Sequence, residues 1–194
     1  MNFIPKIEWN EFTVIGTTAV SSPIITAISD TSGTRSGMYI SGTGIPLGSK
    51  VVSFTATTIT INLNATVAGS PTITLVERVT FDLPPDGDNL RKSLSAKTKL
   101  TPSTNGTIQA QHDYTEETFK VSFALVTQAV TDLVEDFMLT HALQGKSFKY
   151  FEHFDEVDFF TVTLNKLLFK HDRIIADGSG GFIQNFTMDL RRLR

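Results

Sequence analysis

The stretch "SGMYISGTGIPLGSKVVSF" occupies Ser36–Phe54 and sets the character of the first third of the chain. It holds four glycines and one proline, and Lys50 is its only charged residue. Met38 and Ile40 alternate with other residue types, which predicts a short strand, and Val51–Phe54 predicts a second one. Glycine reaches positive φ and proline fixes a turn residue, so the intervening "GTGIPLGS" predicts a tight turn.

The same composition continues on both sides, from about Gly16 to Leu75, where Thr, Ser, Gly, Ile and Val dominate. The only charged residues in this span are Asp30, Arg35 and Lys50. Period-two alternation of β-branched residues between turn residues is typical of short strands. We expect such strands within residues 22–29, 37–42, 50–54, 57–64 and 71–76. In the last two strands the apolar residues alternate with polar ones: Ile59, Ile61 and Leu63 in one, and Ile73 and Leu75 in the other.

This span is therefore expected to be a small all-β module. Tyr39 and Phe54 are its two aromatic residues. We expect them in its core or at its rim, where they are candidate outward-facing contacts. A phosphate-binding loop is a weaker interpretation of "GTGIPLGSK", because the glycine spacing differs from that of a P-loop and no helix pattern follows.

The composition changes at about Glu77, after which charged residues and phenylalanines are dense. Such a change indicates a domain boundary. Residues 1–15 share the second composition, so residues 1–15 and 76–194 are expected to form one β domain. Residues 16–75 would be inserted into a hairpin of that domain, since insertions succeed where the chain ends lie close together.

The second block predicts a strand at 77–83, a long polar loop at Pro84–Gln109, and a strand carrying Phe119, Val121 and Phe123 on one face. Further strands are expected after Gly145, with Phe182, Phe186 and Met188 as core residues. Between them the apolar period changes from two to that of a helix, at about residues 128–144. The helix would begin after Thr127 as a cap and end before Gly145. Its buried face is expected to hold Val130, Leu133, Val134, Phe137, Met138 and His141.

These elements predict a mainly β fold: a β-sandwich or split-barrel core with one packed α-helix, plus the small inserted module. The chain has 194 residues, a formal net charge of −3 and no cysteine. Pro5, Glu8 and Glu11 interrupt the N-terminal region where a signal peptide needs an apolar stretch. No apolar run approaches the roughly 20 residues of a membrane span. We expect no membrane insertion, and a protein that stays where it is made or leaves within an assembly.

The densest ionisable cluster is "FEHFDEVDFF", with Glu152, His153, Asp155, Glu156 and Asp158. Carboxylates beside a histidine suit acid–base catalysis or metal binding. A turn with solvated charges between aromatic core positions is the favoured interpretation.

Other candidate sites are weak. The histidines, at 112, 141, 153 and 171, form no closely spaced zinc pair, and His141 is expected to be a hydrogen-bonded histidine at the core edge. "DGDN" at Asp86–Asn89 lacks the distal glutamate of a calcium loop. We therefore predict no catalytic residue, no metal and no cofactor.

The C-terminal "LRRLR" brings together Arg191, Arg192 and Arg194. These arginines are expected either to be solvated or ion-paired at a strand end, or to contact a neighbouring subunit, because arginine is enriched at interfaces. A long polar loop also becomes ordered against partners, which makes Asn89, Leu90 and Arg91 further candidate subunit-interface residues.

The stretch "GMYISGTGIPLGSKVVSFTATTITINLNATVAGSPTITL" resembles the small Thr/Gly-rich β-modules of tailed-phage structural proteins. "SFALVTQAVTDLVEDFMLTHALQGKSFKYFEH" is similar to the strand–helix–strand segment of siphophage distal tail proteins and lambda-type minor tail proteins. The approach "NGTIQAQHDYTEETFKVSF" is also similar. The placement of the extra module near the N-terminus, in place of a large C-terminal carrier domain, departs from the usual distal tail layout.

The resemblance implies a structural virion protein in the tail-tip or baseplate ring, assembled in the host cytoplasm. Its partners would be copies of itself in a ring, commonly a hexamer, the tail tube protein, and the hub and fibre proteins. Genomic DNA would pass through the ring without specific binding, and no enzymatic activity is implied. Two alternatives remain open: an adhesin or carbohydrate-binding accessory module of a virion and, with less support, a cell-wall or glycan hydrolase using the Glu152–Asp158 carboxylates.

Overall fold

The computed structural model describes residues 4–81, 91–102, 108–152, 157–166, 171–176 and 182–193; side chains are described in residues 4–81, 116–152, 157–166 and 185–193. The chain divides into two compact units. The large unit comprises Met1–Ile7 and Val79–Arg194, and the small unit comprises Glu8–Arg78. The strands β1 (Lys6–Ile15) and β6 (Thr72–Thr80) each run from one unit into the other.

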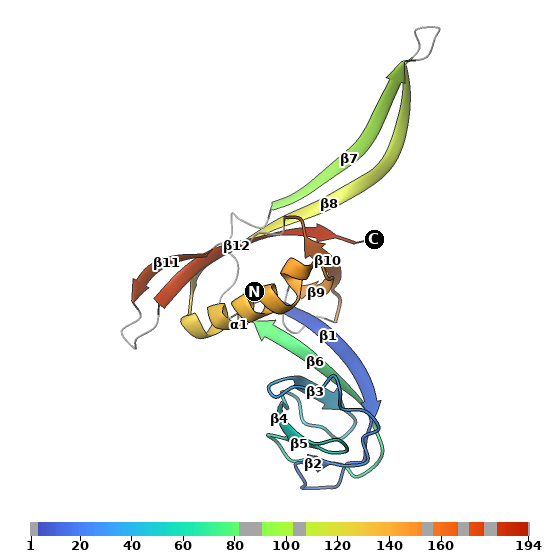
Figure 1. Cartoon of the computed structure of the whole chain (residues 1–194), viewed down its shortest axis with the longest axis vertical. Helices are drawn as coiled ribbons and strands as arrows, with labels where there is room; N and C mark the ends of the chain where they lie inside the picture. The colour runs from blue at the N-terminus through green and yellow to red at the C-terminus, as the bar shows by residue number, and fades with distance from the viewer. Residues whose placement is uncertain are drawn as a thin grey trace. The chain divides into compact units, whose positions relative to one another are not determined.

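The small unit is built from two antiparallel groups of short strands (Figure 1). In one group, β3 (Tyr39–Gly42) pairs with β6, which neighbours β1. The other has the order β2-β5-β4, where β2 is Ile24–Ile25, β4 is Val51–Phe54 and β5 is Ile59–Ile61. One apolar core fills this unit: Val14, Ile25, Ile28, Met38, Ile40, Val51, Ile59, Ile61, Ile73 and Leu75.

The turn expected between β3 and β4 is present. Gly44 and Gly48 have φ values of 77° and 82°, which a side chain strongly disfavours. The strand expected within residues 57–64 is shorter than its alternation predicts, because β5 ends at Ile61 and Leu63 lies beyond it with 40% of its surface exposed.

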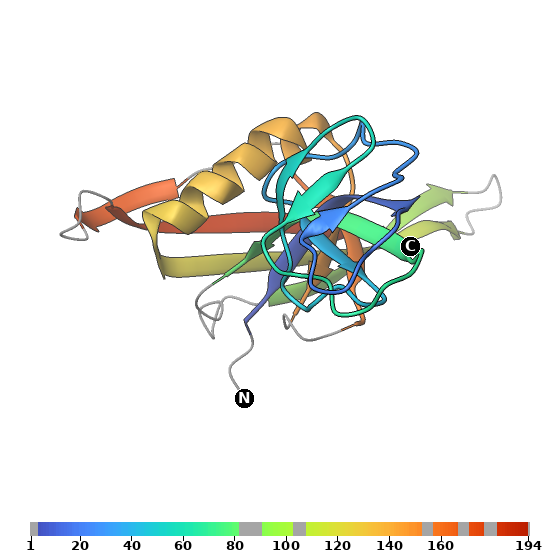
Figure 2. The same cartoon turned by 90° about the horizontal axis from the view of Figure 1, so that it is seen from below.

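The large unit is an antiparallel sheet with one helix (Figures 1 and 2). Its strand order is β1-β9-β10-β12-β8-β7, and β11 pairs with β12 beside this path. The elements that follow β6 are β7 (Arg91–Pro102), β8 (Ile108–Val126), α1 (Gln128–Thr140), the 3-10 turn η1 (Ala142–Gln144), β9 (Phe148–Phe151), β10 (Phe160–Leu164), β11 (His171–Ala176) and β12 (Phe182–Arg192). This architecture confirms the predicted mainly β class with one packed helix.

Phenylalanines form the centre of the large unit. The Phe81 and Phe123 rings stack with centroids 4.0 Å apart, and Phe186 lies 5.0 Å from Phe123. Phe137 of α1 is fully buried and meets the Phe148 ring of β9 edge-on at 4.9 Å. The sheet and the helix are thus joined by aromatic contacts, which accounts for several of the 15 phenylalanines.

The helix departs from expectation in two details. Leu133 was predicted on the buried face, yet 54% of its surface is exposed, because the helix turns a narrower apolar stripe toward the sheet. Thr127 stands at the N-cap, but its side chain makes no capping hydrogen bond. Its carbonyl instead accepts hydrogen bonds from the backbone and hydroxyl of Thr131. Gly145 ends the helical segment with φ 76°, as predicted.

The predicted long loop at Pro84–Gln109 is wrong for most of its length. Residues 91–102 form β7, which pairs with β8 from Arg91 opposite Lys120 to Pro102 opposite Ile108. The pairing joins backbone groups, so a strand whose sequence is largely polar can form it.

Candidate functional site: an extended ribbon and a pocket at its foot

The most distinctive feature of the large unit is a two-stranded ribbon made by β7 and β8. The pairing of β12 with β8 covers only Thr118–Val126, at the C-terminal end of β8. Residues 108–117 of β8 therefore pair with β7 alone. Figure 1 shows the two strands extending together beyond β12 and away from the helix. An isolated two-stranded ribbon is marginally stable in water, so such a segment is suited to packing against a partner.

Two ion pairs join β12 to the foot of the ribbon, which is defined here as Glu116 and Glu117 of β8. An Arg192 guanidinium nitrogen lies 3.2 Å from a carboxylate oxygen of Glu117, whose side chain is 2% exposed. Arg191 lies 3.7 Å from Glu116, the preceding residue of β8. The ion-paired alternative for these arginines is therefore observed within one subunit. The Arg191 and Arg192 side chains remain 46% and 34% exposed, so a second contact with a neighbouring subunit stays a prediction.

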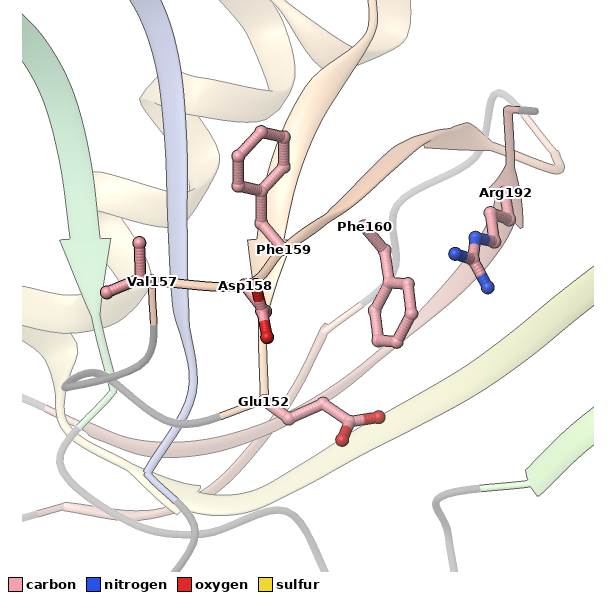
Figure 3. Close-up of a pocket in the computed structure, with 6 residues that line it drawn as sticks. All are labelled: Glu152, Val157, Asp158, Phe159, Phe160 and Arg192. Carbon is pink, nitrogen blue, oxygen red and sulfur yellow. The ribbon is translucent and has the colours of Figure 1, made fainter.

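A pocket of about 750 Å³ opens at this foot (Figure 3). It is lined by Glu152 after β9, by three residues leading into β10, by Phe160 at the start of β10, and by Arg192 at the end of β12. The three residues are Val157, Asp158 and Phe159. Antiparallel pairing of β10 with β9 and with β12 brings these segments together.

Among the residues whose side chains are described, no cation is in contact with the two pocket carboxylates. Figure 3 shows the Glu152 and Asp158 carboxylates turned toward the same space as the Phe160 ring. Among the residues whose side chains are described, neither carboxylate makes a hydrogen bond or an ion pair. The cations nearby are engaged elsewhere: Lys149 Nζ lies 4.5 Å from the Phe159 ring centre, and the Arg192 guanidinium lies 4.5 Å from that of Phe160.

The rim of the pocket is apolar and exposed. Val157 is 87% exposed and Phe159 is 43% exposed. Exposed aromatic and aliphatic side chains beside two carboxylates suit a ligand that combines positive charge with apolar surface. The remaining members of the predicted acidic cluster, His153, Asp155 and Glu156, lie outside the described residues.

The aromatic residues predicted as outward contacts of the module differ in their surroundings. Tyr39 is partly buried, and both Lys50 Nζ and the Arg78 guanidinium lie 4.5 Å from its ring centre. Arg78 is also ion-paired with Glu8 at 2.6 Å. The Tyr39 ring is thus packed by cations of its own unit, whereas Phe54 is 43% exposed on β4.

The other predicted positions divide into described and undescribed ones. His141 is buried, and its Nε2 lies 2.8 Å from the Ser147 carbonyl oxygen, so this nitrogen donates the hydrogen bond. This contact confirms the predicted core-edge histidine. Arg91 lies at the start of β7, with its side chain outside the described set. Asp86–Asn89, Leu90, Arg194 and the side chains of His112 and His171 also lie outside it.

Within the described part of the chain, no three His, Cys, Asp or Glu side chains are grouped as a metal site requires. The pKa of Asp30 is lowered. The cause is a hydrogen bond that the Ser32 backbone N–H donates to Asp30 Oδ1 at 2.8 Å. None of the described helices is long and apolar enough to span a membrane.

Comparison with known proteins gave no match to a protein-family model, to a curated protein or to a solved structure. Sequence reasoning selected Glu152, Asp158 and Arg192 individually. It missed their convergence with Phe160 and the ribbon itself, for which the alternation of Leu94, Ala96, Thr98 and Leu100 was the available signal.

Proposed function

We propose that this chain is a structural protein of a tailed-phage virion, a subunit of the tail-tip or baseplate ring that connects the tail tube to the hub and fibres. The observation that carries the proposal is the β7–β8 ribbon. Its outer part pairs with no other described strand, so it offers hydrogen-bonding edges and a surface to a neighbouring chain.

The mainly β architecture with one packed helix is compatible with the class of protein that the sequence resembles. Ring assembly needs interfaces in which one surface of a subunit meets a different surface of the next. A ribbon that extends from the large unit and a pocket at its foot are two such different surfaces. The exposed parts of Arg191 and Arg192 add candidate anchors beside that pocket.

The proposed partners are further copies of this chain in a ring, taken as a hexamer, together with the tail tube protein and the hub and fibre proteins. Genomic DNA would pass through the ring. The formal net charge of −3 supports passage without retention, because strong DNA binding depends on many Lys and Arg contacts with phosphates. The chain would be assembled in the host cytoplasm and reside at the tail tip, and the proposal requires no catalysis.

Immunogold electron microscopy of virions that carry this chain tests the location. We expect gold particles at the end of the tail distal to the head. Label on the head, label along the whole tube, or virions without label would overturn the proposal. An unrelated antibody of the same class serves as the control for adventitious labelling.

A further inference from the structure

We infer that the pocket lined by Glu152 and Asp158 receives the distal part of the β7–β8 ribbon from a neighbouring copy of the chain. This inference deepens the proposed function and rests on it, because it assigns two surfaces to the ring interface. The distal ribbon is defined here as residues 96–102 of β7 and 108–115 of β8. It begins beyond Glu116 and Glu117, which the arginines of β12 already pair.

Two carboxylates and one arginine are among the residues that line the pocket, so this lining favours a partner with positive charge. Glu152 and Asp158 share the pocket, and no described residue forms an ion pair or hydrogen bond with either of them. A single small cation would leave the exposed Val157 and Phe159 uncovered. The lysines of a polypeptide segment can pair with the two carboxylates, while its aliphatic residues cover the exposed Val157 and Phe159.

The distal ribbon has that chemistry. Its sequence contains Lys97 and Lys99 and one acidic residue, Asp113, with Leu100 and Ile108 among its apolar residues. Both of its strands lack a third strand in the described structure, so it needs a partner to become well packed. Every copy of the chain supplies one such ribbon and one such pocket, so the two surfaces are always present in equal number.

The positions of the two surfaces suit a head-to-tail interface. Arg192 lines the pocket and also pairs with Glu117, so the pocket lies at the foot of the ribbon. The ribbon extends away from this foot (Figure 1), which places its distal part apart from the pocket of its own subunit. Contact between the distal ribbon of one copy and the pocket of the next is therefore heterologous, the kind of contact that closes into a ring.

Charge reversal on each side, alone and combined, tests the inference in the full-length protein. The first variant is Lys97→Glu with Lys99→Glu, and the second is Glu152→Lys with Asp158→Lys. Sedimentation velocity over a concentration series measures self-association. Each variant is expected to raise the dissociation constant about 10- to 100-fold, which is the lower end of the effect of close charge pairs across interfaces. The variant carrying all four changes is expected to return most of the lost affinity, because the reversed charges attract again.

Matched variants exclude an effect of net charge. Lys146→Glu with Lys166→Glu, and Asp132→Lys with Asp136→Lys, make the same charge changes at exposed positions of the large unit. They are expected to assemble as the wild type does, and far-UV circular dichroism checks that each variant is folded.

The outcomes separate the inference from the proposed function. Unchanged assembly of the pocket variant or of the ribbon variant would overturn the ribbon–pocket contact. Failure of the variant with all four changes to regain affinity would overturn it as well. In both cases a ring formed by the wild type would still support the proposed function. A wild-type chain that does not self-associate at any concentration would overturn both.

Discussion

Replacement of Gly44 by alanine tests the turn between β3 and β4. Gly44 has φ 77°, and a Cβ added to it would lie 2.8 Å from the Val67 Cβ and 3.0 Å from the Val67 carbonyl oxygen. The Val67 segment cannot move away freely. The Thr66 N–H donates to the Gly44 carbonyl at 2.8 Å, and the Thr18 hydroxyl donates to the Val67 carbonyl at 2.8 Å.

The expected cost has two parts. A left-handed conformation costs a non-glycine residue about 1–2 kcal/mol. Relief of the contact with Val67 strains or breaks the neighbouring hydrogen bonds, at about 1 kcal/mol each. Gly44→Ala should therefore lower the free energy of unfolding of the small unit by about 3 kcal/mol. Gly48→Ala is the matched control, because φ is 82° there but nothing lies within 4 Å of the added Cβ. It should cost only the conformational part, about 1–2 kcal/mol.

Trp9 provides the assay. It is the only tryptophan of the chain, belongs to the small unit and is 7% exposed. Its fluorescence during denaturant titration should report unfolding of that unit. Equal losses of stability in Gly44→Ala and Gly48→Ala would show that the close approach to Val67 does not exist and would refute the reasoning.

Three further predictions concern other parts of the chain. Phe123→Ala removes a side chain that is 2% exposed and stacked on Phe81, and it should lower the free energy of unfolding measured by circular dichroism by about 3–5 kcal/mol; a loss below about 1 kcal/mol would contradict the aromatic core. Leu125→Asn should raise the free energy of unfolding by up to about 1 kcal/mol. Leu125 has φ 58° and is 55% exposed, and asparagine tolerates this left-handed conformation better than leucine does. A variant that melts at a lower temperature than the wild type would contradict this prediction. The pKa of Asp30 is lowered by its hydrogen bond with Ser32, so the ionised carboxylate stabilises the folded protein at pH values above the ordinary carboxyl pKa of about 4. This stabilisation is lost as the pH falls through the lowered pKa. The stability difference between wild type and Asp30→Ala should shrink in that acidic range, and a difference that grows on acidification would reverse the sign of the argument.

The sequence predicted the small unit best, because its strands have one buried face. Alternating β-branched residues place Ile59 and Ile61 inward, and both are at most 2% exposed. Leu63 continues the same alternation and is nevertheless exposed, because periodicity does not show where a strand ends. The turn glycines were recognised because positive φ leaves few residues to choose from.

The ribbon and the pocket were harder to predict, since both depend on contacts distant in the sequence. β7 pairs with β8 through backbone groups, and such pairing leaves little trace in a polar sequence. The pocket needs β10 to pair with both β9 and β12, which brings Glu152 near Arg192 across 40 positions of the chain. A local cluster of charges identified some of its residues, but no local pattern gave their arrangement.

The most direct test of the central claim is the native mass of the full-length protein, measured by multi-angle light scattering and accompanied by negative-stain images. The same measurement is made on a variant in which an Asn-Gly turn replaces residues 97–114, since Ala96 and Thr115 lie opposite each other. We predict a closed ring with a mass that is a whole multiple of the chain mass, and a variant that remains folded but is monomeric. A full-length protein that stays monomeric at every concentration, or a shortened variant that forms the same ring, would contradict assembly through the ribbon.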